Sequence, residues 1–175
     1  ADTCFDKEST GRIAGFLTTV PNGVQAMSKH IEGLVETSLN LGQLNHDDQS
    51  LTATFSVRSS VNEEKEALLK TLQSVAEGFG GTFESRGHYP AWEYKKDSTL
   101  RELMIEVFKD QYGKEPKVEA IHAGLECGLL GEKIPGLDCI SIGPDMQDIH
   151  TSRERLEIAS TQRTWEFLLA VLKNL

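Results

Sequence analysis

The chain has 175 residues, of which 38% are hydrophobic and 26% are charged, and its formal net charge is −9. This balance is typical of a globular domain, or of two small half-domains. The acidic charge argues against nucleic-acid binding, which needs a clustered basic face, and no apolar run approaches the ~20 residues of a membrane span. We therefore expect neither a nucleic acid nor a membrane as a partner.

The beginning of the sequence and its cysteines indicate where the protein works. There is no leading methionine and no signal segment, so the start at Ala1 is more typical of an excised piece. Cys4, Cys127 and Cys139 form no CxxC pair and are odd in number. Small buried thiols in a reducing cytoplasm are therefore expected rather than disulfides. Cys139 lies in the apolar run LDCISI, where packing is the favoured role, although the sequence leaves a catalytic cysteine open.

The first half of the chain predicts helices on an antiparallel sheet. STGRIAGFLTTV has the apolar spacing of an amphipathic helix, and PNGV ends it. GLVETSLNLGQL and SLTATFSVRS are rich in strand-forming residues, and NHDDQ between them predicts a hairpin turn. VNEEKEALLKTLQSVAEGFGG predicts a helix capped by Asn62, and TFESRGHY predicts a further strand. Residues 1–88 are thus expected to form an α+β layer in the order α-β-β-α-β.

The second half predicts an α/β layer. HYPAWEYKKDS, with its proline, tryptophan and charges, indicates a crossing between substructures. STLRELMIEVFKDQYG predicts a helix, PKVEAIHAG a strand that runs into a tight glycine turn, and LDCISIGPD a buried strand. A last helix is expected over residues 159–174.

Two charged motifs are explained more simply by local structure than by chemistry. His46 and Asp48 have a spacing that can bind a metal, but they lie in the predicted hairpin turn, where Asn and Asp are expected anyway. Glu63 and Glu64 resemble a base beside a metal-binding carboxylate. They lie in the first turn of a predicted helix, where acids are favoured by the helix dipole.

The stretch AIHAGLECG, with His122, Gly124 and Glu126, is a candidate binding turn. A strand that ends in a glycine turn and enters a helix exposes backbone N–H groups, which suit an anion. A plain strand-to-helix turn with Gly124 at positive φ explains the residues equally well.

A second polar loop follows the predicted strand LDCISIG and contains His150 between Asp145 and Asp148 on one side and two arginines on the other. Loops at the carboxyl ends of neighbouring strands often meet, so we expect these residues to lie near His122 and Glu126. A lone surface histidine is the simpler alternative. Arg58, at the end of SLTATFSVR, can bind a carboxylate through two parallel hydrogen bonds or be a solvated charge.

Several segments together resemble a known family. IHAGLECGLL, SIGPDMQDIHTSRERLEI and TQRTWEFLLAVL resemble the C-terminal end of bacterial aminoacyl-histidine dipeptidases, members of the metallopeptidase family that includes carnosinases and aminoacylases. PNGV, GLVETSLNLG, FSVRSS and GHYPAWEY resemble the same proteins.

The resemblance implies part of an α+β lid domain at residues 1–88, then the C-terminal part of a dizinc exopeptidase-like α/β catalytic domain at residues 89–175. It implies hydrolysis of dipeptides, including Xaa-His substrates such as carnosine, with two Zn²⁺ ions, or Mn²⁺ or Co²⁺ in their place. His150 falls on a metal ligand of the family, and Arg58 and the glycine turn at Gly124 fall in its substrate pocket. His122 and Glu126 belong to the same turn and are expected to bind substrate with it.

The sequence also departs from the family. Its H-x-D motif, bridging aspartate, adjacent glutamates and further aspartate ligand have no counterpart here, so the general base is expected outside this chain. A zinc site needs about four ligands. The isolated chain is therefore expected to be inactive. Alternative functions are a non-catalytic lid or dimerisation module, in which a homodimer is left open, and an N-acyl amino acid amidohydrolase of the same fold.

Overall fold

The computed structural model of the chain describes residues 4–47, 49–120 and 126–175. Two compact units divide it: one comprises Ala1–Tyr94 with Ala120–Leu129, and the other comprises Lys95–Glu119 with Leu130–Leu175. The predicted domains, residues 1–88 and 89–175, refer to a larger protein and stay a prediction.

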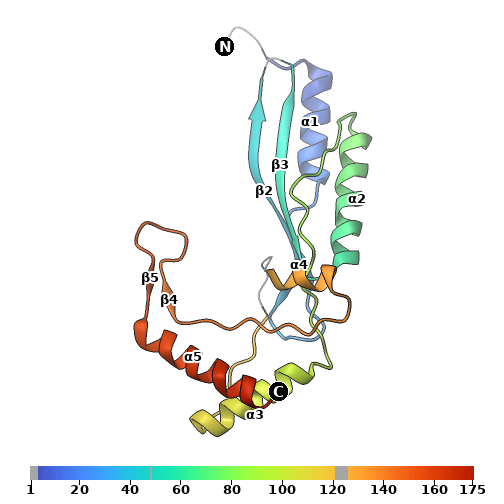
Figure 1. The fold of residues 1–175 in the computed structure, drawn as a ribbon. Coiled ribbons are helices and arrows are strands. Elements are labelled where there is room, and N and C mark those ends of the chain that lie inside the picture. Colours follow the sequence, from blue (N-terminus) through green and yellow to red (C-terminus); the bar gives the residue numbers. More distant parts are fainter. Residues whose placement is uncertain (1–3, 48, 121–125) are drawn as a thin grey trace. The chain divides into compact units, whose positions relative to one another are not determined.

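The first unit is a three-stranded antiparallel sheet with two helices, α1 and α2, which lie side by side (Figure 1). The strand order is β1-β2-β3, so consecutive strands are neighbours. The predicted helices and hairpin are confirmed, whereas the sequence prediction missed the first strand. In chain order the elements are α1 (Lys7–Thr19), β1 (Gly23–Met27), β2 (Val35–His46), β3 (Leu51–Ser59) and α2 (Asn62–Gly78).

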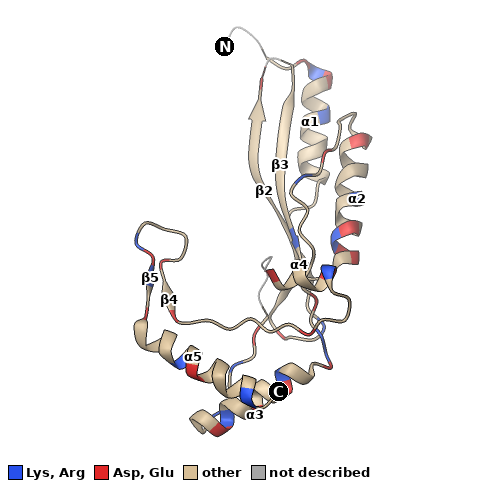
Figure 2. Cartoon of the chain, viewed as in Figure 1, with Lys and Arg blue, Asp and Glu red and all other residues tan. Residues whose placement is uncertain are grey.

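Side chains along β2 and β3 point alternately toward the helices and away from them. Every second residue of β3 is half-buried and those between are exposed, as expected when one face of a sheet packs on a core. Leu39 of β2 lies in that core with Leu68 and Leu72 of α2. The two strands carry almost no charge, with Arg58 as the one basic residue of β3 (Figure 2).

The start of α2 differs from the prediction. Val61, not Asn62, is the N-cap, and its own side chain makes no capping hydrogen bond. Asn62 is the first helical residue, and its amide oxygen instead accepts hydrogen bonds from the backbone N–H of Ala91 at 3.0 Å and from Lys65 Nζ at 3.2 Å. Glu63 and Glu64 lie in the first turn of the helix, as predicted.

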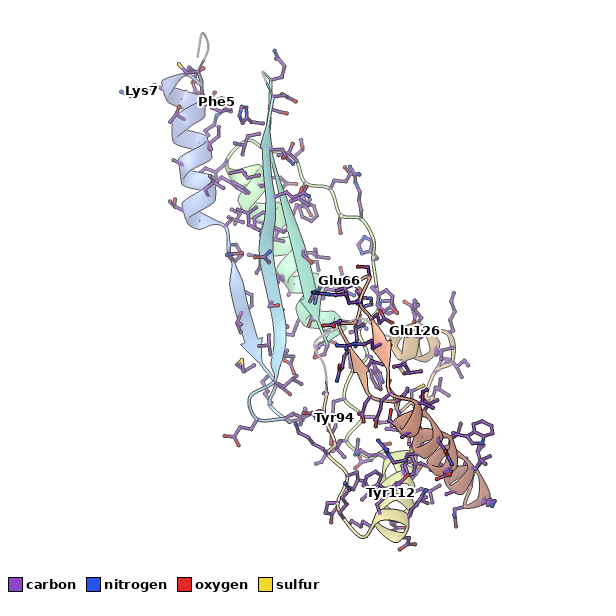
Figure 3. All side chains as sticks on the ribbon, turned by 90° about the vertical axis from the view of Figure 1, so that its left-hand side faces the viewer. Phe5, Lys7, Glu66, Tyr94, Tyr112 and Glu126 are labelled. Atoms are coloured by element: carbon purple, nitrogen blue, oxygen red, sulfur yellow. The ribbon has the colours of Figure 1, made fainter. Side chains whose placement is uncertain are left out.

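The second unit is built around two helices, α3 (Thr99–Tyr112) and α5 (Ile158–Lys173), with a small antiparallel pair formed by β4 (Met146–Gln147) and β5 (Arg155–Leu156). Val107 of α3 packs with Phe167 and Val171 of α5. The phenol of Tyr112 (Figure 3) donates a hydrogen bond to the backbone oxygen of Arg163 at 3.2 Å. A further helix, α4 (Glu126–Lys133), has residues in both units.

Three predicted strands are wrong where the structure describes them. Residues 82–89, 116–120 and 137–145 have no strand assignment, and they carry no helix either. A strand exists only when a neighbour accepts and donates its backbone hydrogen bonds, and within the described residues none of these segments pairs into a sheet. These three segments therefore have no regular secondary structure in the described chain, despite their β-forming residues.

The structure also tests the predicted burial of the cysteines and the expected absence of a membrane span. Cys4 is exposed and Cys127 and Cys139 are half-buried, so the prediction of three buried thiols is wrong. None of the helices in the described residues has the length and apolarity to cross a bilayer.

The carboxylate of Asp138 forms hydrogen bonds with the start of α3. Asp138 accepts hydrogen bonds from the Ser98 hydroxyl at 2.8 Å and from the backbone N–H of Leu100 at 3.1 Å. Burial alone would raise the pKa of Asp138, but these hydrogen bonds and the charges of Lys95 and Arg101 lower it below its ordinary value. The ionised carboxylate therefore stabilises the second unit.

This predicts a pH-dependent role for Asp138 in stability. Because its folded pKa lies below the unfolded value of ~4, the stabilisation is complete above that pH and is lost as the pH falls through the folded pKa. Asp138→Asn should lower the free energy of unfolding by about 1–3 kcal/mol at pH 7, with a smaller difference below about pH 3. Urea unfolding followed by circular dichroism measures both values.

The control for this experiment is Asp110→Asn, which changes an exposed carboxylate of α3. It should alter stability by less than about 0.5 kcal/mol. Equal effects of the two substitutions at pH 7 would show that the Asp138 contacts are not what stabilises the unit.

Candidate functional site

Arg58 is held at the end of β3 by a partly buried pair of hydroxyl groups on the opposite face. Arg58 pairs with Ser38 across the strands, while the next pair, Thr37 and Ser59, joins through a hydrogen bond of 2.9 Å between their hydroxyls. Ser59 also bonds both backbone groups of Val61. The end of β3 is therefore fixed, and Arg58 points away from the core.

The guanidinium of Arg58 is exposed and makes no ion pair or hydrogen bond with any described residue. Its planar fork matches a carboxylate in geometry and charge. The position thus suits the predicted carboxylate contact, and the role itself stays a prediction.

Glu126 is the first residue of α4 (Figure 3) and is exposed. Desolvation, followed by the negative charges of Glu126 and of Cys127 when ionised, raises the pKa of the Tyr89 phenol. Tyr89 is therefore a protonated hydrogen-bond donor near the start of α4 at neutral pH. His122 and Gly124, the other predicted residues of this turn, lie outside the described residues.

Residues 89–93, which connect the two halves of the chain, are fastened to the start of α2. Lys65 Nζ donates a hydrogen bond to the backbone oxygen of Tyr89 at 2.7 Å, and the backbone N–H of Asn62 donates one to Glu93 at 3.0 Å. Sequence reasoning missed Tyr89 and Lys65 as parts of this region. The GHYPAWEY motif was the available signal, but its pattern does not reveal which helix it contacts.

Gly128 permits a close approach between α4 and the same segment. A Cβ at this position would lie 2.7 Å from the backbone oxygen of Pro90 and 3.4 Å from that of Ala91. Only glycine allows this contact without displacement of backbone. Glu126 and the Tyr89 region are therefore brought together by a packing requirement of α4.

His150 lies in the seven-residue loop between β4 and β5. It has a left-handed backbone, with φ of 66°, and Asp148 in the same loop has φ of 53°. Such conformations are uncommon for residues other than glycine and are often found at functional sites. The backbone N–H of His150 donates a hydrogen bond to the carboxylate of Glu154 at 2.8 Å.

Hydrogen bonds at its base attach this loop to α5. The hydroxyl of buried Ser160 accepts a hydrogen bond from the backbone N–H of Asp145 at 2.9 Å. The backbone N–H of Glu157 donates to the Asp145 oxygen at 3.0 Å, and Arg163 pairs with both carboxylates. The loop with His150 is thus anchored, although its tip is exposed.

The described residues do not by themselves fit a zinc site. No group of three or more His, Cys, Asp or Glu side chains is close enough to hold a metal within the described part of the chain. In the His150 loop, Asp148 pairs with Arg155 and Glu154 bonds the His150 backbone. His150 offers one nitrogen donor where zinc needs about four ligands.

The sequence predicts His46 in the hairpin turn, whereas the structure places it at the end of the strand that precedes this turn. It is the last residue of β2 and pairs with Leu51. Beyond it, the backbone N–H groups of Gln49 and Ser50 donate to the Asp47 carboxylate at 2.8 and 2.7 Å and lower its pKa. Asp48 lies outside the described residues.

Arg58 and Glu126 belong to the first compact unit, whereas His150, Asp145 and Asp148 belong to the second. The predicted convergence of these side chains therefore spans two bodies. It stays a prediction.

Comparisons with known proteins find similarity to peptidases. No family model matches the chain. It is 34% identical over 159 residues to the cytosol non-specific dipeptidase of Escherichia coli (strain K12), which corresponds to 91% of this chain and 33% of the relative. The chain thus spans about a third of the length of this curated relative.

Two solved peptidase structures are also similar to this chain. The aminoacylhistidine dipeptidase of Vibrio alginolyticus matches with a TM-score of 0.89 and 35% identity, over 98% of this chain and 35% of that one. The aminopeptidase PepT of Bacillus cereus ATCC 10987 matches with a TM-score of 0.70 at 19% identity, over 93% of this chain and 44% of that one, and so shares the fold. The resemblance to aminoacyl-histidine dipeptidases and the mixed α/β and α+β fold class are confirmed.

The close approach at Gly128 predicts opposite effects for two glycines of α4. Gly128→Ala should destabilise the protein by about 1–3 kcal/mol, because the methyl group meets backbone atoms that cannot move aside easily. Gly131→Ala should stabilise it by about 0.5–1 kcal/mol, because nothing lies within 4 Å of the new methyl group and alanine favours helix. Thermal unfolding of both variants tests the pair. Stabilisation by both would show that α4 does not pack on residues 90–91.

Proposed function

We propose that this chain is the C-terminal part of a metal-dependent cytoplasmic dipeptidase that hydrolyses dipeptides, including Xaa-His substrates. The observation that carries the proposal is the structural match to an aminoacylhistidine dipeptidase over nearly the whole chain, at a TM-score of 0.89. An E. coli relative is likewise a dipeptidase by name. The rest of the enzyme supplies the general base and most metal ligands in this proposal.

In this enzyme Arg58 binds the C-terminal carboxylate of the substrate. Support comes from its exposed guanidinium, its fixed position at the end of β3, and the lack of a competing carboxylate among the described residues. Backbone N–H groups of the turn at Gly124 and the side chains of His122 and Glu126 complete the proposed substrate contacts.

The proposed metals are two Zn²⁺ ions, with Mn²⁺ or Co²⁺ as alternatives, and this chain contributes His150 as one ligand. Bound zinc supplies Lewis-acid activation of water and of the peptide carbonyl. Because the described residues do not complete a zinc site, the contribution of this chain is to orient one ligand and to hold the substrate.

A chimaera tests the proposed role of Arg58. In it, this chain replaces the matched third of the E. coli dipeptidase. It should hydrolyse a histidine dipeptide, whereas the isolated chain should not. Arg58→Ala should remove a charge-assisted contact of roughly 1.5–3 kcal/mol, a loss of about 10- to 150-fold in kcat/KM.

Arg58→Lys should restore little of this loss, because a point charge cannot form two parallel hydrogen bonds. Arg86→Ala is the matched control, since among the described residues Arg86 forms an ion pair with its exposed neighbour Glu84 and with no other residue, and it should keep the full rate. If kcat/KM of Arg58→Ala equals that of the control, Arg58 is a solvated charge and does not bind the substrate. No turnover by the unsubstituted chimaera would argue against the dipeptidase function.

Histidine substitutions test the metal assignment in the same chimaera. His150→Ala should lose one of two metals and nearly all activity without a change in circular dichroism, because the loop is exposed and contributes no core residue. Metal retention by the unsubstituted protein should fall as the pH drops through the histidine range, since a ligand must be deprotonated to bind. Elemental analysis measures both.

His46→Ala is the control for this experiment and should retain both metals and the full rate, because His46 ends a hairpin strand. Retention of two metals by His150→Ala, or of only one by His46→Ala, would show that the assignment of His150 as the metal ligand is wrong.

A further inference from the structure

Two polar side chains of the first unit, Tyr89 and Glu126, lie near each other without a hydrogen bond between them. The Tyr89 phenol is 37% exposed, and Glu126 begins α4. Glu126 is close enough for its charge to act on the phenol. Neither side chain forms a hydrogen bond or an ion pair with any residue that the structure describes. The phenol and the carboxylate can therefore both bind a ligand.

The backbone that carries this pair is fixed. Tyr89 precedes Pro90, and the proline ring restricts the residue before it to extended conformations. The backbone oxygen of Tyr89 accepts a hydrogen bond from Lys65 Nζ at 2.7 Å. Gly128, two residues after Glu126, allows α4 to contact the backbone oxygen of Pro90. The same contacts thus set the position of both side chains before any ligand binds, which lowers the entropy cost of binding.

The pair combines one hydrogen-bond donor with one acceptor. Desolvation, followed by the charges of Glu126 and Cys127, raises the pKa of Tyr89. The phenol therefore keeps its proton across the neutral range and can donate it, whereas the carboxylate of Glu126 accepts. A neutral imidazole matches this combination, because one of its ring nitrogens accepts a hydrogen bond and the other donates one. An aliphatic side chain leaves both groups unpaired, which a polar site strongly disfavours.

The pair also lies in the same unit as Arg58. Arg58 is near the end of β3, and α2 starts shortly after it at Asn62. The segment with Tyr89 is bonded to that start, because Asn62 accepts a hydrogen bond from the backbone N–H of Ala91 at 3.0 Å. In a C-terminal histidine the carboxylate and the imidazole branch from one carbon atom. Groups that bind them must therefore come from neighbouring parts of the protein, as these do.

We propose that Tyr89 and Glu126 bind the imidazole of a C-terminal histidine, with the phenol donating to one ring nitrogen and the carboxylate accepting from the other. This inference rests on the proposed dipeptidase function and deepens it, because it names the residues that select histidine over an aliphatic residue. Arg58 contributes to both kinds of substrate, since every dipeptide has a C-terminal carboxylate.

Two substrates that differ only in the C-terminal side chain test this selection in the chimaera. The readout is the histidine preference, which is kcat/KM for alanyl-histidine divided by kcat/KM for alanyl-leucine. Tyr89→Phe should lower it about 3- to 10-fold, the effect of one lost hydrogen bond. Glu126→Ala should lower it about tenfold or more, and Glu126→Gln should keep part of it, because the amide oxygen still accepts. Arg58→Ala should leave it unchanged while lowering both rates.

Tyr94→Phe is the matched control. It removes a phenol hydroxyl from the same segment but keeps the ring that stacks on His30 with centroids 6.0 Å apart. Its histidine preference should equal that of the unsubstituted chimaera. An equal preference for Tyr89→Phe and Tyr94→Phe overturns the inference and leaves the dipeptidase function standing.

Binding to the 175-residue chain is a second measurement that needs no hydrolysis. N-acetyl-histidine is titrated into the chain, with N-acetyl-leucine as the reference, and the amide NMR signals of Tyr89, Ala91 and Glu126 are followed. Shifts caused by the histidine compound alone, and weakened in Tyr89→Phe, support the inference. If the chimaera is inactive on both dipeptides, the same shifts support the imidazole site and the lost turnover contradicts the function. Equal shifts with both compounds, or none with either, overturn the inference.

Discussion

The antiparallel pairing of β2 with β3 is the constraint on which the first unit depends. Because side chains alternate between the two faces of a strand, one register decides which residues enter the core and which face outward. The pairing of Leu39 with Val57 places both toward α2, and the neighbouring pair of Ser38 and Arg58 faces away. A slip of β3 by one residue would bury Arg58 and expose Val57. The hydrogen bond between the hydroxyls of buried Thr37 and half-buried Ser59 reinforces the correct register.

The segment at residues 89–93 depends on this unit in turn. Asn62 and Lys65 at the start of α2 bond its backbone, and Gly128 lets α4 pack directly on it. These contacts bring the phenol of Tyr89 near Glu126. A connection without secondary structure thereby becomes a fixed part of the candidate substrate region.

The second unit has a packed core between α3 and α5 and an exposed apolar surface on α5. The packing of α3 on α5 and the Asp138 contacts define its interior, and the bonds at Ser160 fix the base of the His150 loop on α5. The chain as a whole spans 35% of the length of the solved dipeptidase that it matches.

Sequence alone determined the elements whose information is local. The periodicity of α1, α2, α3 and α5 and the turn residues between β2 and β3 predicted these elements correctly, because hydrophobic spacing and turn chemistry act within a few residues. The motif pattern also identified the dipeptidase resemblance, and His46 adjoins the predicted hairpin turn.

Only the tertiary structure decided the features that depend on distant partners. Residues 82–89 and 137–145 have strand-like composition but no pairing within the described chain, since a strand is defined by its neighbour and not by its own residues. Asn62 could cap a helix by type, yet it binds Ala91, 29 residues away. Likewise, α5 looks like one amphipathic helix in sequence, and only its packing on α3 shows which apolar side is already covered and which is exposed.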